Sequence, residues 1–276
     1  CTFCIVPFTR GRERSRSISS IVKEAKSILK SGYQEITLLG QNVNSYKTPE
    51  GDFPVLLDKL GKIKSIKRIR YTSPHPRDID EELLKIMVKH DNICNQIHLP
   101  LQAGSSRILK RMNRTYTKEE FLNLVDLIKK YIPDCGLSTD IIVGFPGETE
   151  EEFQETLEVV SKVKFDTAFM FKYSSRPGTK ASHYTDHISE DIKQQRLQTL
   201  IEFQQNISLM NNRRRIGLNL DVLIEKESKK STSQWAGRIE NNVWVIFDKK
   251  DGYKIGDIVN VNIIDAKGIS LFGNIN

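Results

Sequence analysis

Up to about residue 211, the apolar residues follow two spacings that alternate along the chain. Segments such as 18–29 carry apolar residues three and four apart, whereas short runs such as 36–39 are mostly apolar. The first spacing predicts helices with one buried face, and the second predicts short buried strands. This pattern predicts helices over residues 17–31, 56–62, 80–89, 105–112, 121–128 and 189–211, and strands over residues 36–39, 69–71, 96–99, 137–143 and 168–173.

Two of the helix starts carry a capping box, Thr117 with Glu120 and Thr149 with Glu152. Strand, polar loop and helix recur in this order, which is typical of parallel βα units with right-handed crossovers. We therefore expect an α/β fold, an incomplete (β/α) barrel whose first strand lies before Cys1. In such folds the loops after the carboxyl ends of the strands carry the functional site.

The pattern changes after the basic run at residues 213–215. Short apolar segments separated by Gly, Asn and Asp turns predict strands over residues 220–225, 235–240, 243–247, 258–264 and 270–274. About sixty residues of this kind predict a small all-β barrel. The expected domains are residues 1–213 and residues 214–276.

Composition narrows the class of protein. The 276 residues are 38% hydrophobic, and the net charge of +7 suggests an anionic partner. Residues 216–276 contain equal numbers of bases and acids, so the positive excess lies in residues 1–215. Four scattered cysteines do not form a disulfide framework, which favours a reducing cytoplasm, and no apolar run approaches the length of a membrane span.

The first sixteen residues hold the strongest chemical signal. Cys1 and Cys4 stand two residues apart, and four arginines follow in the next twelve residues. Two thiolates at this spacing can bind one soft metal centre, and the arginines indicate an anion nearby. Half of a zinc site, a redox dithiol and two unrelated cysteines are the other readings. Because the chain opens inside a ligand motif, we expect further ligands upstream.

Several motifs together resemble one known family, the radical S-adenosylmethionine methylthiotransferases, and within it the type that acts on isopentenyl-modified adenosine in tRNA. The resemblance spans the chain from end to end. The motifs that carry it are residues 1–7 with 9–11, 38–44, 98–102, 112–114, 140–148, 169–174 with 176–179, and 228–231.

The resemblance implies a cofactor set and a site. Cys1 and Cys4 match the second and third cysteines of a Cys-x-x-x-Cys-x-x-Cys cluster motif, whose first cysteine would lie four residues before Cys1. The family uses S-adenosylmethionine and, in the full-length protein, two 4Fe-4S clusters. Ala103 stands where related sequences usually have Ser. Taken singly, each loop also fits ordinary turn chemistry. The cofactor-binding residues that the resemblance implies are Gln41, Ser73, Gln102, Ser105, Arg114, Asp140 and Gly144.

The remaining cysteines and histidine receive a structural interpretation. Cys94 and Cys135 are isolated in the sequence and are expected to be small buried residues. We also expect His98 to be structural, although it lies close to the predicted site.

The terminal barrel resembles a TRAM domain, an RNA-binding module of the same family. The resemblance implies that the substrate is tRNA at the anticodon stem-loop, that the electron donor is a flavodoxin or ferredoxin, and that the protein is a monomer without a membrane partner. Two alternatives stay open: a sister enzyme acting on threonylcarbamoyl-adenosine or on a ribosomal protein, and a non-catalytic RNA-binding module with a structural zinc. The predicted RNA-binding residues are Arg10, Arg12, Lys226, Lys229, Lys230 and Arg238, with stacking by Trp235 or Trp244.

Overall fold

The computed structural model describes residues 1–11 and 13–276, so the prediction for Arg12 lies outside the described residues. The helices of the first module are α1 (Val6–Arg10), α2 (Ile18–Lys30), α3 (Phe53–Gly61), α4 (Glu81–Lys89), α5 (Ser106–Arg111), α6 (Lys118–Tyr131), α7 (Glu150–Val163) and α8 (Glu190–Arg213), with short 3₁₀ turns η1 (Val43–Ser45), η2 (Pro76–Asp78) and η3 (Lys180–His183). Its strands are β1 (Glu35–Leu38), β4 (Arg68–Tyr71), β5 (Gln96–His98), β6 (Gly136–Val143) and β7 (Thr167–Lys172), with a small hairpin of β2 (Lys47–Thr48) and β3 (Gly51–Asp52).

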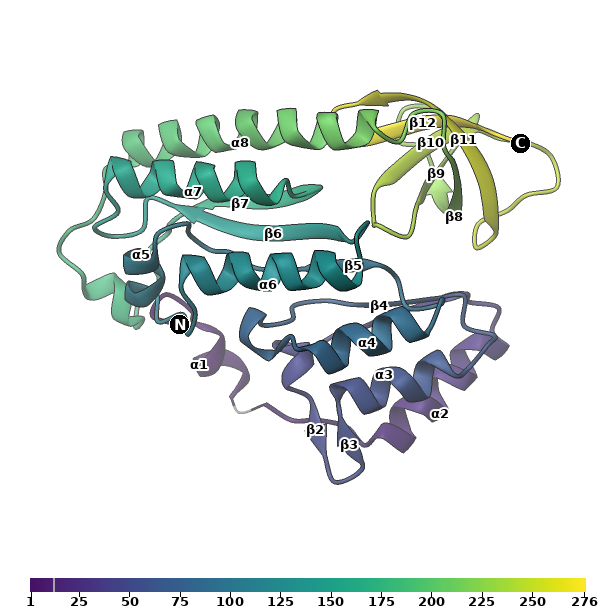
Figure 1. Cartoon of the computed structure of the whole chain (residues 1–276), viewed down its shortest axis with the longest axis horizontal. Coiled ribbons are helices and arrows are strands. Elements are labelled where there is room, and N and C mark those ends of the chain that lie inside the picture. The colour runs from purple at the N-terminus through teal and green to yellow at the C-terminus, as the bar shows by residue number, and fades with distance from the viewer. Residues whose placement is uncertain (12) are drawn as a thin grey trace.

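The main strands of this module all run parallel. β1 pairs with β4, and β5, β6 and β7 pair in that order. A single parallel bridge between Ile69 and Ile93 links β4 to the segment that leads into β5. Helices flank this open, curved sheet, and α8 runs along the module into the terminal domain (Figure 1). The predicted incomplete α/β barrel is confirmed.

Local signals in the sequence set the helix starts. Both predicted capping boxes form, at Thr117 with Glu120 and at Thr149 with Glu152. The structure departs from the pattern at α1, a five-residue helix in a stretch that the sequence reads as a basic loop. A proline in its first turn favours the helical start, but so short a helix has no apolar periodicity to detect.

The terminal domain is a closed barrel of β8 (Asn219–Glu227), β9 (Gln234–Arg238), β10 (Trp244–Asp248), β11 (Ile258–Lys267) and β12 (Ser270–Ile275), in the order β10-β12-β11-β8-β9. Its own apolar core includes Val245 and Phe247. Because side chains alternate along a strand, the partly exposed Trp244 lies on the outer side of β10. The predicted small β-barrel is therefore confirmed.

Two buried arginines join the barrel to the parallel sheet. Arg68 and Arg70 on β4 are 6% and 4% exposed. The Arg68 guanidinium donates to the carbonyls of Arg238 (2.6 Å) and Asp221 (2.7 Å), and Arg70 donates to those of Glu240 (2.6 Å) and Ile239 (2.9 Å).

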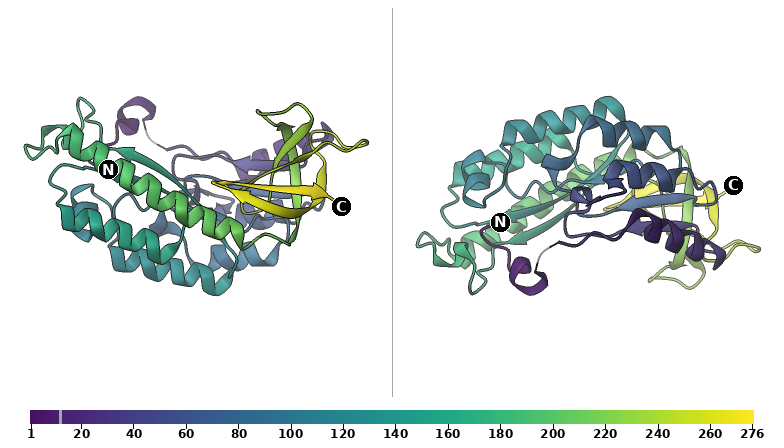
Figure 2. Two further views of the ribbon diagram at one scale, coloured as in Figure 1. Left: turned by 90° about the horizontal axis from the view of Figure 1, so that it is seen from above. Right: turned by 90° about the horizontal axis from the view of Figure 1, so that it is seen from below.

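This joint between the barrel and the sheet lies at one end of the parallel strands. Arg68 begins β4, and Asn95, just before β5, donates its N–H to the Glu240 carboxylate. The barrel thus docks at the amino ends of the strands, away from the loops that follow their carboxyl ends. Both views in Figure 2 place the barrel and α1 far apart. In the described part of the chain, no helix is both long enough and apolar enough to cross a membrane.

Candidate functional site

The two terminal cysteines share one tight turn. The Cys4 N–H donates to the Cys1 carbonyl at 3.5 Å, and both thiols are free. Cys1 is exposed and Cys4 is partly exposed. The turn therefore offers two accessible soft donors, as the sequence predicts. By contrast, Cys94 and Cys135 are buried, and burial raises the pKa of these thiols to about 11 and about 12.

Thr2 fixes this cysteine turn to the rest of the module. Its N–H donates to the Met112 carbonyl at 3.0 Å, and its hydroxyl donates to the Arg111 carbonyl at 2.9 Å. The Thr2 carbonyl accepts from the Ala181 N–H at 2.9 Å. With 8% of its surface exposed, Thr2 ties the cysteines to the end of α5 and to η3.

Aromatic contacts connect the segments after β6 and β7 to the cysteine turn. The Phe3 ring lies 6.1 Å from Phe145 in the loop after β6, and Phe145 lies 5.2 Å from Tyr173 at the end of β7. The Arg114 guanidinium lies 5.9 Å from the Phe3 ring. Its Nε is buried and has no hydrogen-bond partner among the described residues. Arg114 is thus placed beside the cysteines with unused donor capacity.

Ser73 and Gln102 follow β4 and β5 in an unusual backbone conformation. Their φ angles are 58° and 66°, in the left-handed region that costs non-glycine residues energy and is more common at functional sites. Gln102 also bridges to β6, because its N–H donates to the Asp140 carbonyl at 2.8 Å and its carbonyl accepts from Ile142 at 2.9 Å. Both predicted cofactor residues therefore lie just after strand ends, and hydrogen bonds to β6 hold Gln102 in place.

Ser105 has a structural use for its hydroxyl. The side chain is 3% exposed, caps α5 by accepting from the Ile108 N–H, and donates to Glu152 at 2.9 Å. Its hydroxyl is thus engaged both by the helix cap and by Glu152.

Asp140, a predicted cofactor residue, forms a polar pair with His98, which the sequence analysis expects to be structural. The Asp140 carboxylate lies 3.2 Å from His98 Nε2, and His98 Nδ1 lies 3.0 Å from the Ser138 hydroxyl. Two side chains of β6 thus orient the imidazole at the edge of the site. Because side chains alternate along a strand, the order Gln-Ile-His in β5 indicates that His98 and Gln96 lie on the same side of the sheet. This was the signal in the sequence that could have placed His98.

Gly144 needs to be glycine. Its φ is 69°, and a Cβ would meet Lys193 Cγ at 2.4 Å. Its N–H donates to Glu148 Oε2 at 2.6 Å, and Arg196 donates to the same oxygen at 2.9 Å. Glu148 is 3% exposed, and burial raises the pKa of its carboxyl to about 7. Glu148 therefore shapes the loop that carries Gly144, a role that the sequence analysis missed although the carboxylate closes the 140–148 motif.

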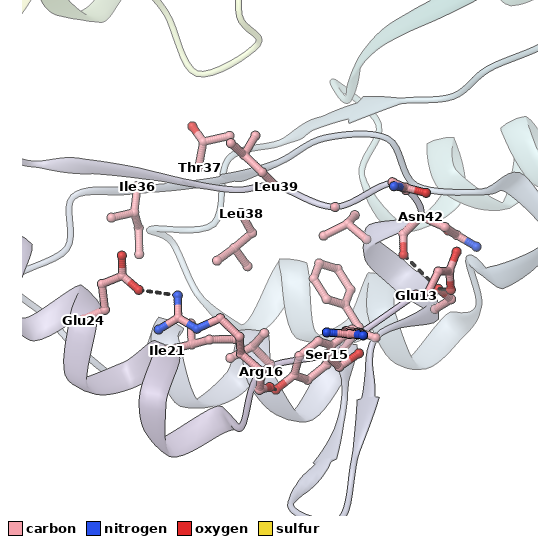
Figure 3. Close-up of a pocket in the computed structure, with 18 of the residues that line it drawn as sticks. Glu13, Ser15, Arg16, Ile21, Glu24, Ile36, Thr37, Leu38, Leu39 and Asn42 are labelled. Carbon is pink, nitrogen blue, oxygen red and sulfur yellow. Dashed lines mark hydrogen bonds and ion pairs between the residues drawn. The ribbon is translucent and has the colours of Figure 1, made fainter. Parts of the chain in front are cut away.

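Gln41 lies in a separate cavity of about 1370 Å³ beside β1, together with Arg10. Ile36 and Leu38 point into it toward α2, whereas Thr37 and Leu39 point to the other side of the strand (Figure 3). Within the described residues β1 pairs with β4 alone, so its other edge is open. The upstream strand expected from the sequence stays a prediction.

The predicted RNA-binding residues do not form one surface. Arg10 ends α1, far from the barrel that carries the others (Figure 2). Lys226 is exposed, with its Nζ 4.3 Å from the centroid of the Trp244 ring, and Lys229 and Lys230 are exposed in the turn after β8.

Arg238 differs from these lysines, because it is already engaged within the barrel. Its guanidinium pairs with the Glu225 carboxylate and donates to Asn242. It also lies 5.3 Å from the Trp244 ring centroid. The side chain therefore supports the tryptophan and has little capacity left for a phosphate.

Family profiles match both modules. The profile described as the Radical SAM superfamily matches residues 1–160, and the profile of the TRAM domain matches residues 213–275.

Curated relatives match nearly the whole chain. A "tRNA-2-methylthio-N(6)-dimethylallyladenosine synthase" of Parabacteroides distasonis is 50% identical over 99% of this chain and 61% of its own length. The protein of the same name from Acetivibrio thermocellus is 49% identical over 100% of this chain and 58% of its own length. The chain thus spans about three fifths of the length of these relatives.

Among solved structures, coproporphyrinogen III oxidase from Escherichia coli, described as a radical SAM enzyme, aligns with a TM-score of 0.51. The identity is 16%, and the alignment covers 81% of this chain and 59% of that chain. At this identity the likeness shows the fold alone.

Proposed function

The chain belongs to the radical SAM superfamily, and on this premise we propose that it forms the catalytic and RNA-binding modules of a tRNA methylthiotransferase. The reaction inserts sulfur and adds a methyl group at C2 of the isopentenyl-modified adenosine next to the anticodon. The observation that carries the proposal is identity of about half of all residues with the named synthases across 99% of the chain.

The residues at the cysteine turn fit the cofactors that the superfamily implies. Cys1 and Cys4 provide accessible thiols from one turn, the donor type that iron–sulfur clusters require. When bound, the cluster and S-adenosylmethionine supply a radical that attacks an aromatic C–H bond, which acid–base side chains cannot do. Two clusters in the full-length protein are part of the proposal.

The chain's own residues hold and orient these groups. Cys1 and Cys4 are proposed as two of the cluster ligands, and the three hydrogen bonds of Thr2 keep their turn in place. Arg114, with its unpartnered Nε beside the turn, suits the carboxylate of S-adenosylmethionine. Gly144 allows the loop after β6 to pack closely on Lys193, and its place among the cofactor residues is assigned on resemblance.

Other strand ends complete the proposed cofactor site. Ser73 and Gln102 present strained backbone, and Asp140 presents a carboxylate that His98 orients. Gln41 lies in the cavity beside β1 and is assigned on resemblance. Ser105 acts through the α5 cap that it forms.

The terminal barrel is proposed to bind tRNA. The match to the TRAM profile supports this proposal. The exposed Lys229 and Lys230 offer phosphate contacts, and Trp244 beside Lys226 offers an aromatic face. A flavodoxin or ferredoxin as reductant and a monomeric state also belong to the proposal.

Mass spectrometry of tRNA nucleosides tests the function. A strain that lacks the gene should lose 2-methylthio-N6-isopentenyladenosine and accumulate the isopentenyl nucleoside, and the full-length gene should restore it. Unchanged methylthio-nucleoside in the deletion strain would contradict the proposal. Iron and acid-labile sulfide analysis of the full-length protein separates this enzyme from a zinc-containing RNA-binding module, which would be colourless.

A further inference from the structure

The side of β7 that carries Phe169 and Phe171 is unusually apolar and exposed. These side chains are 56% and 52% exposed, whereas Met170 between them packs against the core. Large apolar side chains gathered on one exposed face mark contact sites more often than scattered single residues do. The two side chains are therefore typical of a contact site.

Strand register places this pair on the face that carries the polar site residues. Phe169 lies opposite Asp140 and Phe171 lies opposite Ile142 in the parallel β6–β7 pair. Directly paired residues of neighbouring strands share a face of the sheet. The Phe169 ring also meets the His98 ring edge-on, with 6.0 Å between centroids. An apolar wall and a His–Asp pair thus stand side by side.

The same face leads up to the cysteine turn. Tyr173 follows Phe171 by two residues, about 7 Å along an extended strand. Its ring lies 5.2 Å from Phe145, which lies 6.1 Å from Phe3 between the two cysteines. The aromatic strip is therefore continuous with the proposed reaction site.

We propose that Phe169 and Phe171 receive the isopentenyl group of the substrate adenosine and select prenylated over unprenylated RNA. This inference rests on the proposed function. A base that carries a branched five-carbon tail needs an apolar surface beside a polar group, which is what Phe169 and Phe171 present next to His98. The amino and carboxylate groups of S-adenosylmethionine would gain nothing from two phenyl faces, and its adenine ring is the competing occupant that the test below separates from the prenyl tail.

The test uses the full-length enzyme with two anticodon stem-loop RNAs, identical except for the isopentenyl group. Phe169→Ala and Phe171→Ala should each lower kcat/KM for the prenylated RNA about tenfold, the scale of losing apolar contacts in a pocket. Turnover and binding of the unprenylated RNA should hardly change, so selectivity should fall. Phe171→Leu should keep most of it.

Ile192→Ala on α8 is the matched control, because Ile192 is an exposed apolar residue outside this face, and it should leave selectivity intact. Unchanged selectivity in both alanine variants of an active enzyme overturns the inference. A raised KM for S-adenosylmethionine with equal losses on both RNAs also overturns it, since the wall would then serve the cofactor. If the unaltered enzyme forms no methylthio product on prenylated RNA, the proposed function itself fails.

Discussion

Buried arginines of the parallel module and exposed lysines of the terminal barrel differ in what their charges contact. In the parallel module, Arg68, Arg70 and Arg196 are at most 6% exposed, and carbonyl or carboxylate oxygens accept their hydrogen bonds. In the barrel, Lys226 is exposed and covers the face of Trp244. The first group holds the fold together, and the second can exchange its aromatic contact for a phosphate or a base.

This difference shows why the net charge of a segment does not predict the proposed RNA surface. The positive excess of the sequence lies in residues 1–215, where part of it is buried as structural arginine. The barrel segment has balanced charge, yet it presents accessible lysines beside tryptophan. The location and partners of each cation decide its role, and net charge does not report them.

The largest effect is expected from a substitution that stops the chemistry of the parallel module and leaves RNA binding by the barrel intact. In the full-length protein, Cys4→Ala should abolish cleavage of S-adenosylmethionine, because a proposed cluster ligand is lost. The barrel is remote from the turn, so RNA affinity should stay within about twofold and the melting temperature should hardly move. Deoxyadenosine release and RNA binding are the measurements. Cys94→Ala, which removes a buried thiol distant from the turn, is the control and should retain cleavage; normal cleavage by Cys4→Ala would refute the ligand assignment.

The buried arginines should account for much of the stability of the joint between modules. Replacing both Arg68 and Arg70 with Met removes the guanidinium donors of four barrel carbonyls, of which the Ile239 carbonyl keeps the Asn242 N–H, and it also leaves the Glu35 carboxylate without Arg70. We expect a loss of about 3–5 kcal/mol in the free energy of unfolding and separate melting of the barrel in calorimetry. Arg214→Met, at an exposed position, should change stability by less than about 0.5 kcal/mol. A double variant as stable as this control would show that the barrel docks by other contacts.

The buried carboxyl of Glu148 should make stability depend on pH. Burial raises its pKa from 4.5 to about 7, so between these values the folded protein retains a proton that the unfolded chain has released. The free energy of unfolding should therefore fall as pH rises through this window, by about 3 kcal/mol, and level off above pH 7. Glu148→Gln, which cannot ionise, should remove this slope in denaturant titrations. Glu150→Gln, at the exposed second partner of Arg196, should keep it; equal slopes in the protein and Glu148→Gln would contradict the assignment.

Much of the fold could be predicted from the sequence because its signals are local. The apolar run at residues 137–143 differs from β6 by one residue, and both capping boxes form. The joint between modules could not be predicted, since Arg68 and Arg238 are 170 residues apart and share no local pattern. The cofactor-binding residues that the sequence implies stay a prediction. The use of the Ser105 hydroxyl as a helix cap and the contact between Glu148 and Gly144 could not be predicted, because they depend on how the loops pack.

The smallest expected effect concerns the outer face of the barrel. Trp244→Ala removes the aromatic surface under Lys226, so tRNA affinity should fall about tenfold, the lower part of the range for one stacked base. The tryptophan lies outside the barrel core, so the fold should persist. A point substitution is a cleaner test than deleting residues 216–276, because deletion would also expose Arg68 and Arg70. Ile264→Ala, an exposed apolar residue of the barrel, is the control.

The salt dependence of tRNA binding, measured by titration, should separate stacking from phosphate contacts. Trp244→Ala should weaken binding at every salt concentration and leave the slope of log K against log salt concentration nearly unchanged. Replacing Lys229 and Lys230 should reduce that slope by about one to two. Unchanged affinity in both variants would move the RNA surface away from the barrel.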